Sequence, residues 1–235
     1  MALLFGLVSN TSSEAQRISS RLTRNWTPIG AETPELPNNI SPFISSFEIQ
    51  GHLQIGQTDR ALDLIRRSWG WYLNNPNGTA STVIEGYLTN GSFAYRNYRG
   101  YDYDSSYVSH AHGWSSGPTS ALTNYILGLE ITGRLGSEWS LKPQFGDLTS
   151  VEGGFTTGLG KFSAKWKVSK GGEAYTLNWD VPAGTAGTVV LPGLPSGDVG
   201  KLEVNSKKVA SKVSADGGYI LDVAGGKGKV SVKKS

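Results

Sequence analysis

The chain has 235 residues, of which 37% are hydrophobic and 17% are charged, a composition typical of a folded protein and not of a disordered one. It carries 22 basic and 19 acidic residues and no cysteine, which excludes disulfides and thiolate metal sites. No apolar run reaches the roughly 20 residues of a membrane-spanning helix, so we expect no membrane partner. The opening MALLFGLV lacks the basic flank and cleavage site of a signal peptide, and we interpret residues 2–8 as the end of a buried helix.

The basic residues change type along the chain. All nine arginines lie between Arg17 and Arg134, and all thirteen lysines lie between Lys142 and Lys234. We therefore place a domain boundary near Gly136, with domains at residues 1–136 and 137–235. Most of the lysines stand singly between apolar residues, which is typical of the solvent face of a sheet and weighs against a nucleic-acid partner.

The first segment with helical signals follows residue 12. Ser13 and Gln16 fit a capping box, in which the hydroxyl accepts from a free amide of the first turn and the side-chain amide reaches back. Ala15, Ile18 and Leu22 then share one face at helical spacing. Residues 27–40, with three prolines, are predicted to form a long connection.

Two further helices are predicted as an antiparallel hairpin. Ser41 and Pro42 suit an N-cap and a first helical residue, and the helix is expected to end at Gly56. The next helix runs from Thr58 to about Leu73. Within the first of the two, Glu48 and His52 are four residues apart and are expected to pair. A last helix is predicted from Ser116 to Leu129.

Residues 74–117 contain most of the candidate functional side chains of the chain. The turn NNPNG leads into TVIEGY, where Glu85 is a carboxylate among apolar and β-branched neighbours. A tyrosine-rich run, FAYRNYRGYDYDSSYVSHAHGW, follows. Aromatic faces beside hydrogen-bonding groups suit a sugar ring, although a tyrosine-rich loop equally suits a protein interface.

Residues 137–235 are predicted to form β-strands. KFSAKWKV (161–168) and YTLNWDV (175–181) alternate between apolar and polar residues, and Gly171 and Gly172 make the turn of a hairpin. Shorter strands are predicted at 188–191, 201–204, 219–223 and 229–232. The regular spacing of the turns is typical of a β-sandwich.

Several ordered motifs together resemble one family. The runs SPFISSFEIQGHLQIGQTDRALDLI, RRSWGWYLNNPNGTASTVIEGY and SHAHGWSSGPTSALTNYILGL resemble the end of the catalytic domain of α-L-rhamnosidases of glycoside hydrolase family 78, especially the fungal kind. SLKPQFGDLTSVEGG is similar to the start of the β-sandwich that follows it. The resemblance implies an α+β, two-domain fold, in which the last hairpins of a six-hairpin α/α barrel precede an antiparallel β-sandwich.

The resemblance also implies roles for particular residues. Inverting glycosidases use one carboxyl group as general acid and another as general base. Glu85 matches the family's general base, whereas no residue of this chain matches its general acid. His112, Trp71 and Trp114 match substrate-binding positions. Trp69, in contrast, is expected in the core because of its helical spacing from Ala61, Leu62 and Ile65. We therefore expect the intact enzyme to remove terminal rhamnose from glycosides, and the isolated chain to have little or no activity.

Other readings of these residues are less well supported. The spacing of His110 and His112 beside Asp102 and Asp104 matches no standard metal site, so we expect neither a metal nor a cofactor. Two alternative functions remain open. One is a carbohydrate-binding or scaffolding protein without catalysis, and the other is a polysaccharide lyase that uses a tyrosine and a histidine.

The sequence also predicts a secreted glycoprotein. Five N-x-Ser/Thr sequons favour this localisation, and they begin at Asn10, Asn25, Asn39, Asn77 and Asn90.

The closing hairpins of a ring would expose apolar faces if they stood alone. We therefore expect either a missing N-terminal barrel portion or self-association.

Overall fold

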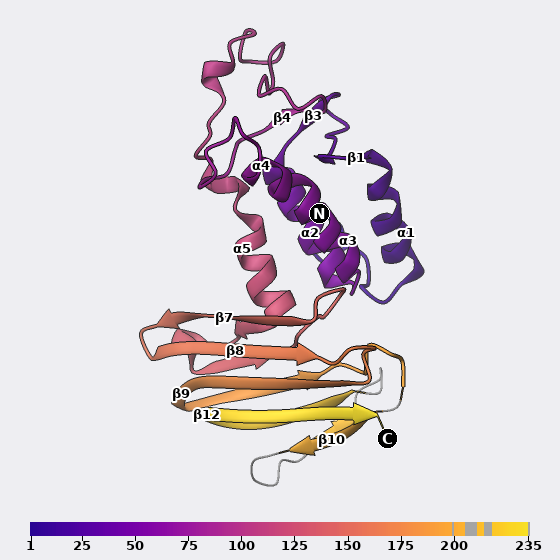
Figure 1. Ribbon diagram of the computed structural model, residues 1–235, viewed down its shortest axis with the longest axis vertical. Coiled ribbons are helices and arrows are strands. Elements are labelled where there is room, and N and C mark those ends of the chain that lie inside the picture. The colour runs from indigo at the N-terminus through magenta and orange to yellow at the C-terminus, as the bar shows by residue number, and fades with distance from the viewer. Residues whose placement is uncertain (199, 205–210, 214–217, 235) are drawn as a thin grey trace. The chain divides into compact units, whose positions relative to one another are not determined.

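The computed structural model describes residues 1–198, 200–204, 211–213 and 218–234. It divides into two compact units, Met1–Ala121 and Leu122–Ser235 (Figure 1). The first unit holds helices, long loops and two short strand pairs, and the second is dominated by one sheet. Among the described residues, the helices are all too short or too polar to span a bilayer.

The first unit begins with turns. The prediction of a buried helix end at residues 2–8 is wrong, because this segment forms successive turns, with Gly6 at a φ of +67°. Leu3 is buried, but Phe5 and Leu7 are exposed. The following helix α1 (Ser13–Leu22) is confirmed, although its cap lies one residue earlier than predicted, because the Ser12 hydroxyl accepts from the Ala15 N–H at 3.1 Å.

The predicted helical hairpin is present. Helix α2 (Pro42–Gln54) starts at Ser41, whose side chain accepts from the N–H of Ile44 as predicted, and it ends before Gly56 at a φ of +73°. The second helix begins as α3 (Thr58–Ile65), widens into the π-helical segment η2 (Arg66–Gly70) and ends as α4 (Trp71–Leu73). The prediction of a helix from Thr58 to Leu73 is therefore confirmed, with a π-helical turn that the periodicity does not reveal.

A buried polar cluster joins the first three helices of this unit. His52 is fully buried, with Nδ1 2.7 Å from Ser19 Oγ and Nε2 3.3 Å from Glu48 Oε1. Trp26 Nε1 donates to the same Glu48 oxygen at 2.6 Å, and Arg60 donates to Ser19 Oγ at 2.8 Å. The predicted Glu48–His52 pair is confirmed. Ser19 and His52 are fully buried and the Glu48 side chain is 12% exposed, so this serine, histidine and glutamate hold helices together and do not form an open site.

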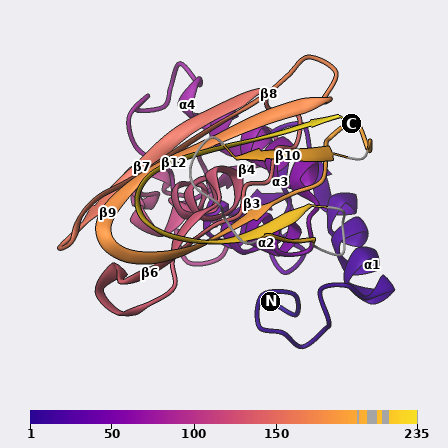
Figure 2. The same cartoon turned by 90° about the horizontal axis from the view of Figure 1, so that it is seen from below.

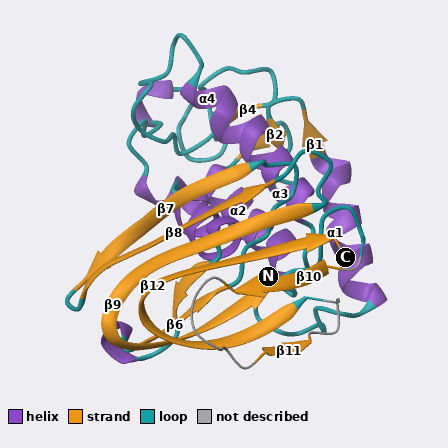
Figure 3. Ribbon diagram, turned by 60° about the horizontal axis from the view of Figure 1, so that its bottom comes forward, coloured by secondary structure: helices purple, strands orange, loops and turns teal. Residues whose placement is uncertain are grey.

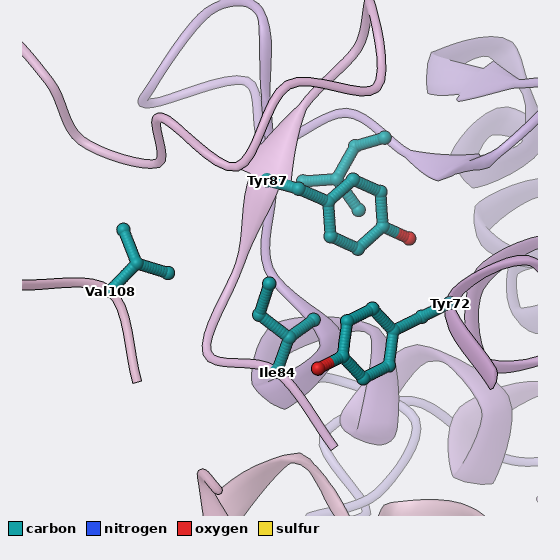
Figure 4. Packing of buried hydrophobic residues seen from close by; sticks show 5 residues of the cluster. Tyr72, Ile84, Tyr87 and Val108 are labelled. Atoms are coloured by element: carbon teal, nitrogen blue, oxygen red, sulfur yellow. The ribbon is translucent and has the colours of Figure 1, made fainter. Parts of the chain in front are cut away.

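The remaining elements of the first unit are short and frame a long loop. They are η1 (Thr23–Asn25), β1 (Trp26–Thr27), β2 (Gly30–Ala31), β3 (Asn39–Ile40), β4 (Tyr87–Leu88), η3 (Ser105–Tyr107), η4 (Gly113–Ser115) and α5 (Gly117–Ala121). Strands β3 and β4 pair antiparallel, which joins the predicted connection 27–40 to the segment after Glu85. Ile40, Tyr72, Ile84, Tyr87 and Val108 form a buried cluster there (Figure 4).

The second unit starts with the π-helical segment η5 (Leu122–Leu127), where the predicted helix continues as far as residue 127 before a strand takes over. Its strands are β5 (Leu129–Ile131), β6 (Glu138–Leu141), β7 (Ser150–Thr157), β8 (Gly160–Val168), β9 (Ala174–Leu191), β10 (Gly200–Val204), β11 (Ser211–Val213) and β12 (Tyr219–Lys234), with the short helix η6 (Arg134–Gly136) between β5 and β6. The composition change near Gly136 thus falls between two strands of one sheet.

The predicted hairpin is confirmed as β8 and β9. Phe162, Ala164 and Trp166 of β8 are buried, and Tyr175 and Leu177 of β9 are buried opposite them. The lysines between them face solvent, as the alternation predicts. Trp166 packs its ring against Phe145 and donates its indole N–H to the Ile126 carbonyl at 2.9 Å.

The two longest strands bend and change partners. Residues 175–180 of β9 pair with β8, whereas residues 186–189 pair in parallel with β6. Strand β12 follows β9 along both halves, with a register shift between Ala224 and Gly226 (Figure 2). The strands predicted at 188–191, 219–223 and 229–232 are therefore parts of these two long strands.

The sheet is continuous. Its hydrogen-bonded path runs β10-β12-β9-β6-β5, and β8 and β7 extend it from the first half of β9 (Figure 3). The sequence predicts an antiparallel sandwich, whereas the described strands form one eight-stranded sheet that curls round on itself and includes a parallel pair. The bends in β9 and β12 produce this difference. Each of these strands runs along one side of the curled sheet, bends, and continues along the other side, as strands that switch between packed sheets do.

Candidate active site

The segment that carries Glu85 lies beside the segment that carries His112. The N–H of Glu85 donates to the Ser109 carbonyl and the N–H of His112 donates to the Val83 carbonyl, each at 2.8 Å. Ile84 and Tyr87 anchor the first segment in the buried cluster of Figure 4, whereas the Glu85 side chain stays half-buried. The structure therefore brings two of the predicted site residues onto adjacent segments.

Both oxygens of the Glu85 carboxylate accept hydrogen bonds. Oε1 accepts from the Tyr101 hydroxyl, and Oε2 accepts from the Ser109 backbone N–H at 3.2 Å. These two donors fix the plane of the carboxylate. Because an ionised carboxylate offers about four lone-pair sites, it keeps the capacity to accept a hydrogen bond from water. This arrangement suits a general base, whose orientation must be set before it takes a proton.

Tyr101 is held as the proton donor of this pair. The hydrogen bond to Glu85, with smaller contributions from burial and the nearby negative charge, raises the pKa of the Tyr101 phenol to about 12. The Arg96 guanidinium, 5.5 Å from the ring centroid, opposes this shift. The phenol therefore remains protonated, and remains a donor to Glu85, across the physiological range.

This pairing predicts a measurable titration. At pH 11 the Tyr101 phenol should remain protonated in the wild-type chain, and Glu85→Gln should lower its pKa toward the usual value near 10, because the negative charge that opposes phenolate formation is gone. NMR of ¹³Cζ-labelled tyrosine, with Tyr101→Phe to assign the signal, measures this. Asp104→Asn, which changes an exposed carboxylate, should leave the signal unchanged. An equal response to both variants would contradict the pairing.

Gly86 is explained by a neighbouring aromatic ring. A Cβ at this position would lie 2.4 Å from a ring carbon of Tyr95, so only glycine lets that ring pack over the backbone beside Glu85. Tyr95 and Tyr101 were not among the predicted site residues. The tyrosine-rich run pointed to the loop, but composition does not show which of its rings turns toward the carboxylate.

The tryptophans differ in their surroundings. Trp71 is half-buried, with its ring centroid 4.4 Å from that of Tyr87, so it lies near the Glu85 segment. Trp114 is 71% exposed and packs its ring edge against Phe43 of α2. Trp69 is buried and donates its indole N–H to the Ser115 carbonyl at 2.6 Å, which confirms the prediction of a core position.

The polar residues near Glu85 do not form a metal site. His110 lies with Nδ1 3.0 Å from the Tyr72 hydroxyl and packs against Phe93, and Asp104 accepts from the Ser106 N–H at the start of η3. Within the described ranges, no three histidine, aspartate or glutamate side chains are grouped so as to hold a metal ion.

Comparison with known proteins shows what the chain is similar to. Residues 137–206 match the family model of the bacterial α-L-rhamnosidase C-terminal domain. No curated protein matches the chain. The fold is similar to that of an α-L-rhamnosidase from Aspergillus terreus, with a TM-score of 0.66 and 23% identity over 98% of this chain and 23% of that one.

Two bacterial structures agree with this likeness. An α-L-rhamnosidase of Streptomyces avermitilis, complexed with L-rhamnose, gives a TM-score of 0.61 and 20% identity over 80% of this chain and 17% of that one. A family 78 rhamnosidase of Bacillus sp. GL1 gives 0.53 and 26% over 72% and 16%. The chain therefore spans between 16% and 23% of the length of these structures. The predicted resemblance to the C-terminal portion of family 78 α-L-rhamnosidases is confirmed.

Proposed function

Because the chain resembles the C-terminal portion of α-L-rhamnosidases, we propose that it is part of an inverting glycoside hydrolase that removes terminal rhamnose from glycosides. The observation that carries this proposal is the family-model match at residues 137–206, together with a fold likeness that extends through the unit containing Glu85. The helices of the first unit would then be the closing hairpins of an α/α barrel, and the curled sheet would correspond to the β-sandwich that follows the barrel in the sequence.

In this proposal Glu85 is the general base. Its carboxylate takes a proton from water as the water attacks the anomeric carbon, on the face opposite the leaving oxygen. Tyr101 and the Ser109 N–H hold both carboxylate oxygens, so no reorientation is needed when the proton moves. The general acid, at a distance of about 6.5–9.5 Å in inverting enzymes, would come from a part of the enzyme outside this chain.

The other predicted site residues take binding roles. His112, beside the Glu85 segment, would hydrogen-bond a rhamnose hydroxyl. Trp71 already contacts Tyr87 and would offer its remaining surface to the sugar, while Trp114 has an exposed face for stacking. These contacts would orient the ring without a cofactor or a metal.

We also propose that the protein is secreted and glycosylated. Asn25 and Asn77 are exposed sequons and support this proposal. Asn39 is an exception, since it is fully buried and its side chain donates to the Pro37 carbonyl and accepts from the Arg96 N–H. Because this side chain is fully buried, a glycan at Asn39 would have no room in the folded protein.

The test is hydrolysis of an aryl α-L-rhamnoside. The purified 235-residue chain should show no turnover, because it supplies one carboxyl group of the pair. A chimera in which residues 1–235 replace the equivalent portion of the Aspergillus terreus enzyme should release the aryl group. NMR should show β-L-rhamnose as the first product, since inversion converts the α linkage.

Two outcomes would count against the proposal. One is a chimera that unfolds cooperatively, and so is folded, yet does not hydrolyse the substrate. The other is a first product that keeps the α configuration. Turnover by the isolated chain would refute the claim that it is inactive alone.

A further inference from the structure

A hollow in the first unit is lined in part by the loop that holds Tyr101. It has a volume of about 410 Å³, which lies within the range of small-ligand sites, roughly 300–1,000 Å³. Its floor is the β3–β4 pair, where Asn39 faces Leu88 and the Thr89 N–H extends the ladder to the Asn38 carbonyl at 2.9 Å. One side of the hollow is therefore rigid backbone.

The opposite wall is the loop 97–103, which is fastened to that floor. The Arg96 N–H donates to the side-chain oxygen of the buried Asn39 at 2.9 Å, and the Tyr103 N–H closes the loop onto the Asn97 carbonyl at 2.7 Å. Asp102 and Tyr103 both adopt positive φ, at 46° and 60°. Two consecutive non-glycine residues in this region cost conformational energy, and such outliers cluster at ligand sites.

The lining has a consistent chemistry. The eight described residues that form it are asparagines, tyrosines, a threonine and a leucine, so none of them carries a charge. Tyr98 and Tyr103 are 49% and 73% exposed and thus present ring surface to a ligand. The buried Asn39 amide is already paired, and the side-chain oxygens of Asn90 and Asn97 accept from the N–H groups of Ser92 and Tyr98. The side-chain NH₂ groups of Asn90 and Asn97 can still donate to sugar hydroxyls, while aromatic faces receive the C–H face of a sugar ring.

We propose that this hollow, which we call the Asn/Tyr pocket, is a binding site for a neutral saccharide. A charged ligand would be desolvated there without a counter-charge from the lining, which disfavours it. The pocket is separate from Glu85, but Tyr101 lies on the same loop between Tyr98 and Tyr103. A saccharide in the pocket would thus bind against the loop that carries Tyr101, while Glu85 is not among the lining residues.

Saturation-transfer-difference NMR on the 235-residue chain tests this proposal. The probes are L-rhamnose, D-glucose and the charged sugar D-glucuronate, and the protein is made in a host without N-glycosylation so that Asn90 at the pocket stays unmodified. We expect signals from the ring C–H protons of the neutral sugars and weaker signals from glucuronate. Binding of D-glucuronate as strong as that of the neutral sugars would overturn the assignment, as would no binding of any probe.

Tyrosine variants inside and outside the pocket test whether the sugar binds there. Tyr103→Ala and Tyr98→Ala should each weaken binding by roughly two- to tenfold, whereas Tyr107→Ala, which removes another exposed ring of the same region outside the pocket, should not. Circular dichroism verifies that each variant is folded. His112→Ala, which removes a proposed rhamnose contact at the catalytic site, should leave the binding in place. Loss of binding in His112→Ala but not in Tyr103→Ala would locate the sugar at the proposed catalytic site and overturn the proposal, whatever the chimera hydrolyses.

Discussion

Replacing Glu85 by glutamine in the chimeric enzyme is expected to lower turnover by roughly 10²–10⁴-fold. The amide has almost the shape of the carboxylate but cannot take a proton from water. The substrate should still bind, because the proposed binding contacts come from other side chains. We therefore expect kcat to fall much more than KM rises, in assays with an aryl α-L-rhamnoside.

The structure adds one requirement to this experiment. Both Glu85 oxygens accept hydrogen bonds, from Tyr101 and from the Ser109 N–H, whereas glutamine has a single acceptor oxygen. One donor therefore loses its partner, at a cost of about 1–3 kcal/mol. Turnover must be measured well below the melting temperature of the variant, so that loss of folded protein is not taken for loss of chemistry.

Asp104→Asn is the matched control for Glu85→Gln. It neutralises an exposed carboxylate of the same region and keeps an acceptor for the Ser106 N–H, so activity should be unchanged. Azide, a nucleophile that needs no base, should partly restore turnover to Glu85→Ala by forming the β-configured rhamnosyl azide. A folded Glu85→Gln enzyme that retains wild-type kcat would remove Glu85 from the mechanism.

Trp166→Ala is expected to destabilise the second unit by ~3–5 kcal/mol. The side chain is fully buried on β8, its ring centroid lies 4.8 Å from that of Phe145, and its indole N–H satisfies the Ile126 carbonyl. Truncation thus leaves a cavity and also an unpaired buried acceptor. Thermal unfolding followed by circular dichroism should show a fall in Tm of more than about 10 °C.

Two variants separate the causes of this loss. Trp166→Phe keeps a ring beside Phe145 but removes the donor to Ile126, so it should cost about 1–3 kcal/mol. Lys165→Ala, on the opposite face of the same strand, removes only an exposed ion pair with Glu152 and should cost at most about 1 kcal/mol. If Trp166→Ala does not fold, the relative stability of the other two variants still tests whether the Trp166 side chain is buried and paired. A Trp166→Phe variant as stable as Lys165→Ala would contradict that burial and pairing.

Helix caps and strand alternation could be predicted from the sequence, because both depend on residues that are close together in the chain. Ser41 and Pro42 begin α2 because capping involves only the next turn. Alternation along β8 and the first half of β9 predicted their burial because both depend on a period of two. The continuation of β9 between Val181 and Thr188 was not predicted, because the alternation stops there, where the strand bends and changes partner.

In the candidate site, too, local features were predictable and non-local contacts were not. Glu85 was predicted as the general base through a resemblance that spans several motifs, and its half-buried setting agrees with its apolar neighbours. Its contact with Tyr101 was not predictable, because that contact depends on the path of a loop with non-glycine residues at positive φ. No periodic pattern encodes such a path.

The long bent pair of β9 and β12 also sets the order in which the second unit is built. Strands β10 and β11 pair with β12, which follows both of them along the chain. During synthesis these strands emerge before the strand that must hold them, and the pairing of β12 with β9 closes a loop that includes them both. We therefore expect β12 to join the sheet by non-local pairing, after the local hairpin of β8 and β9.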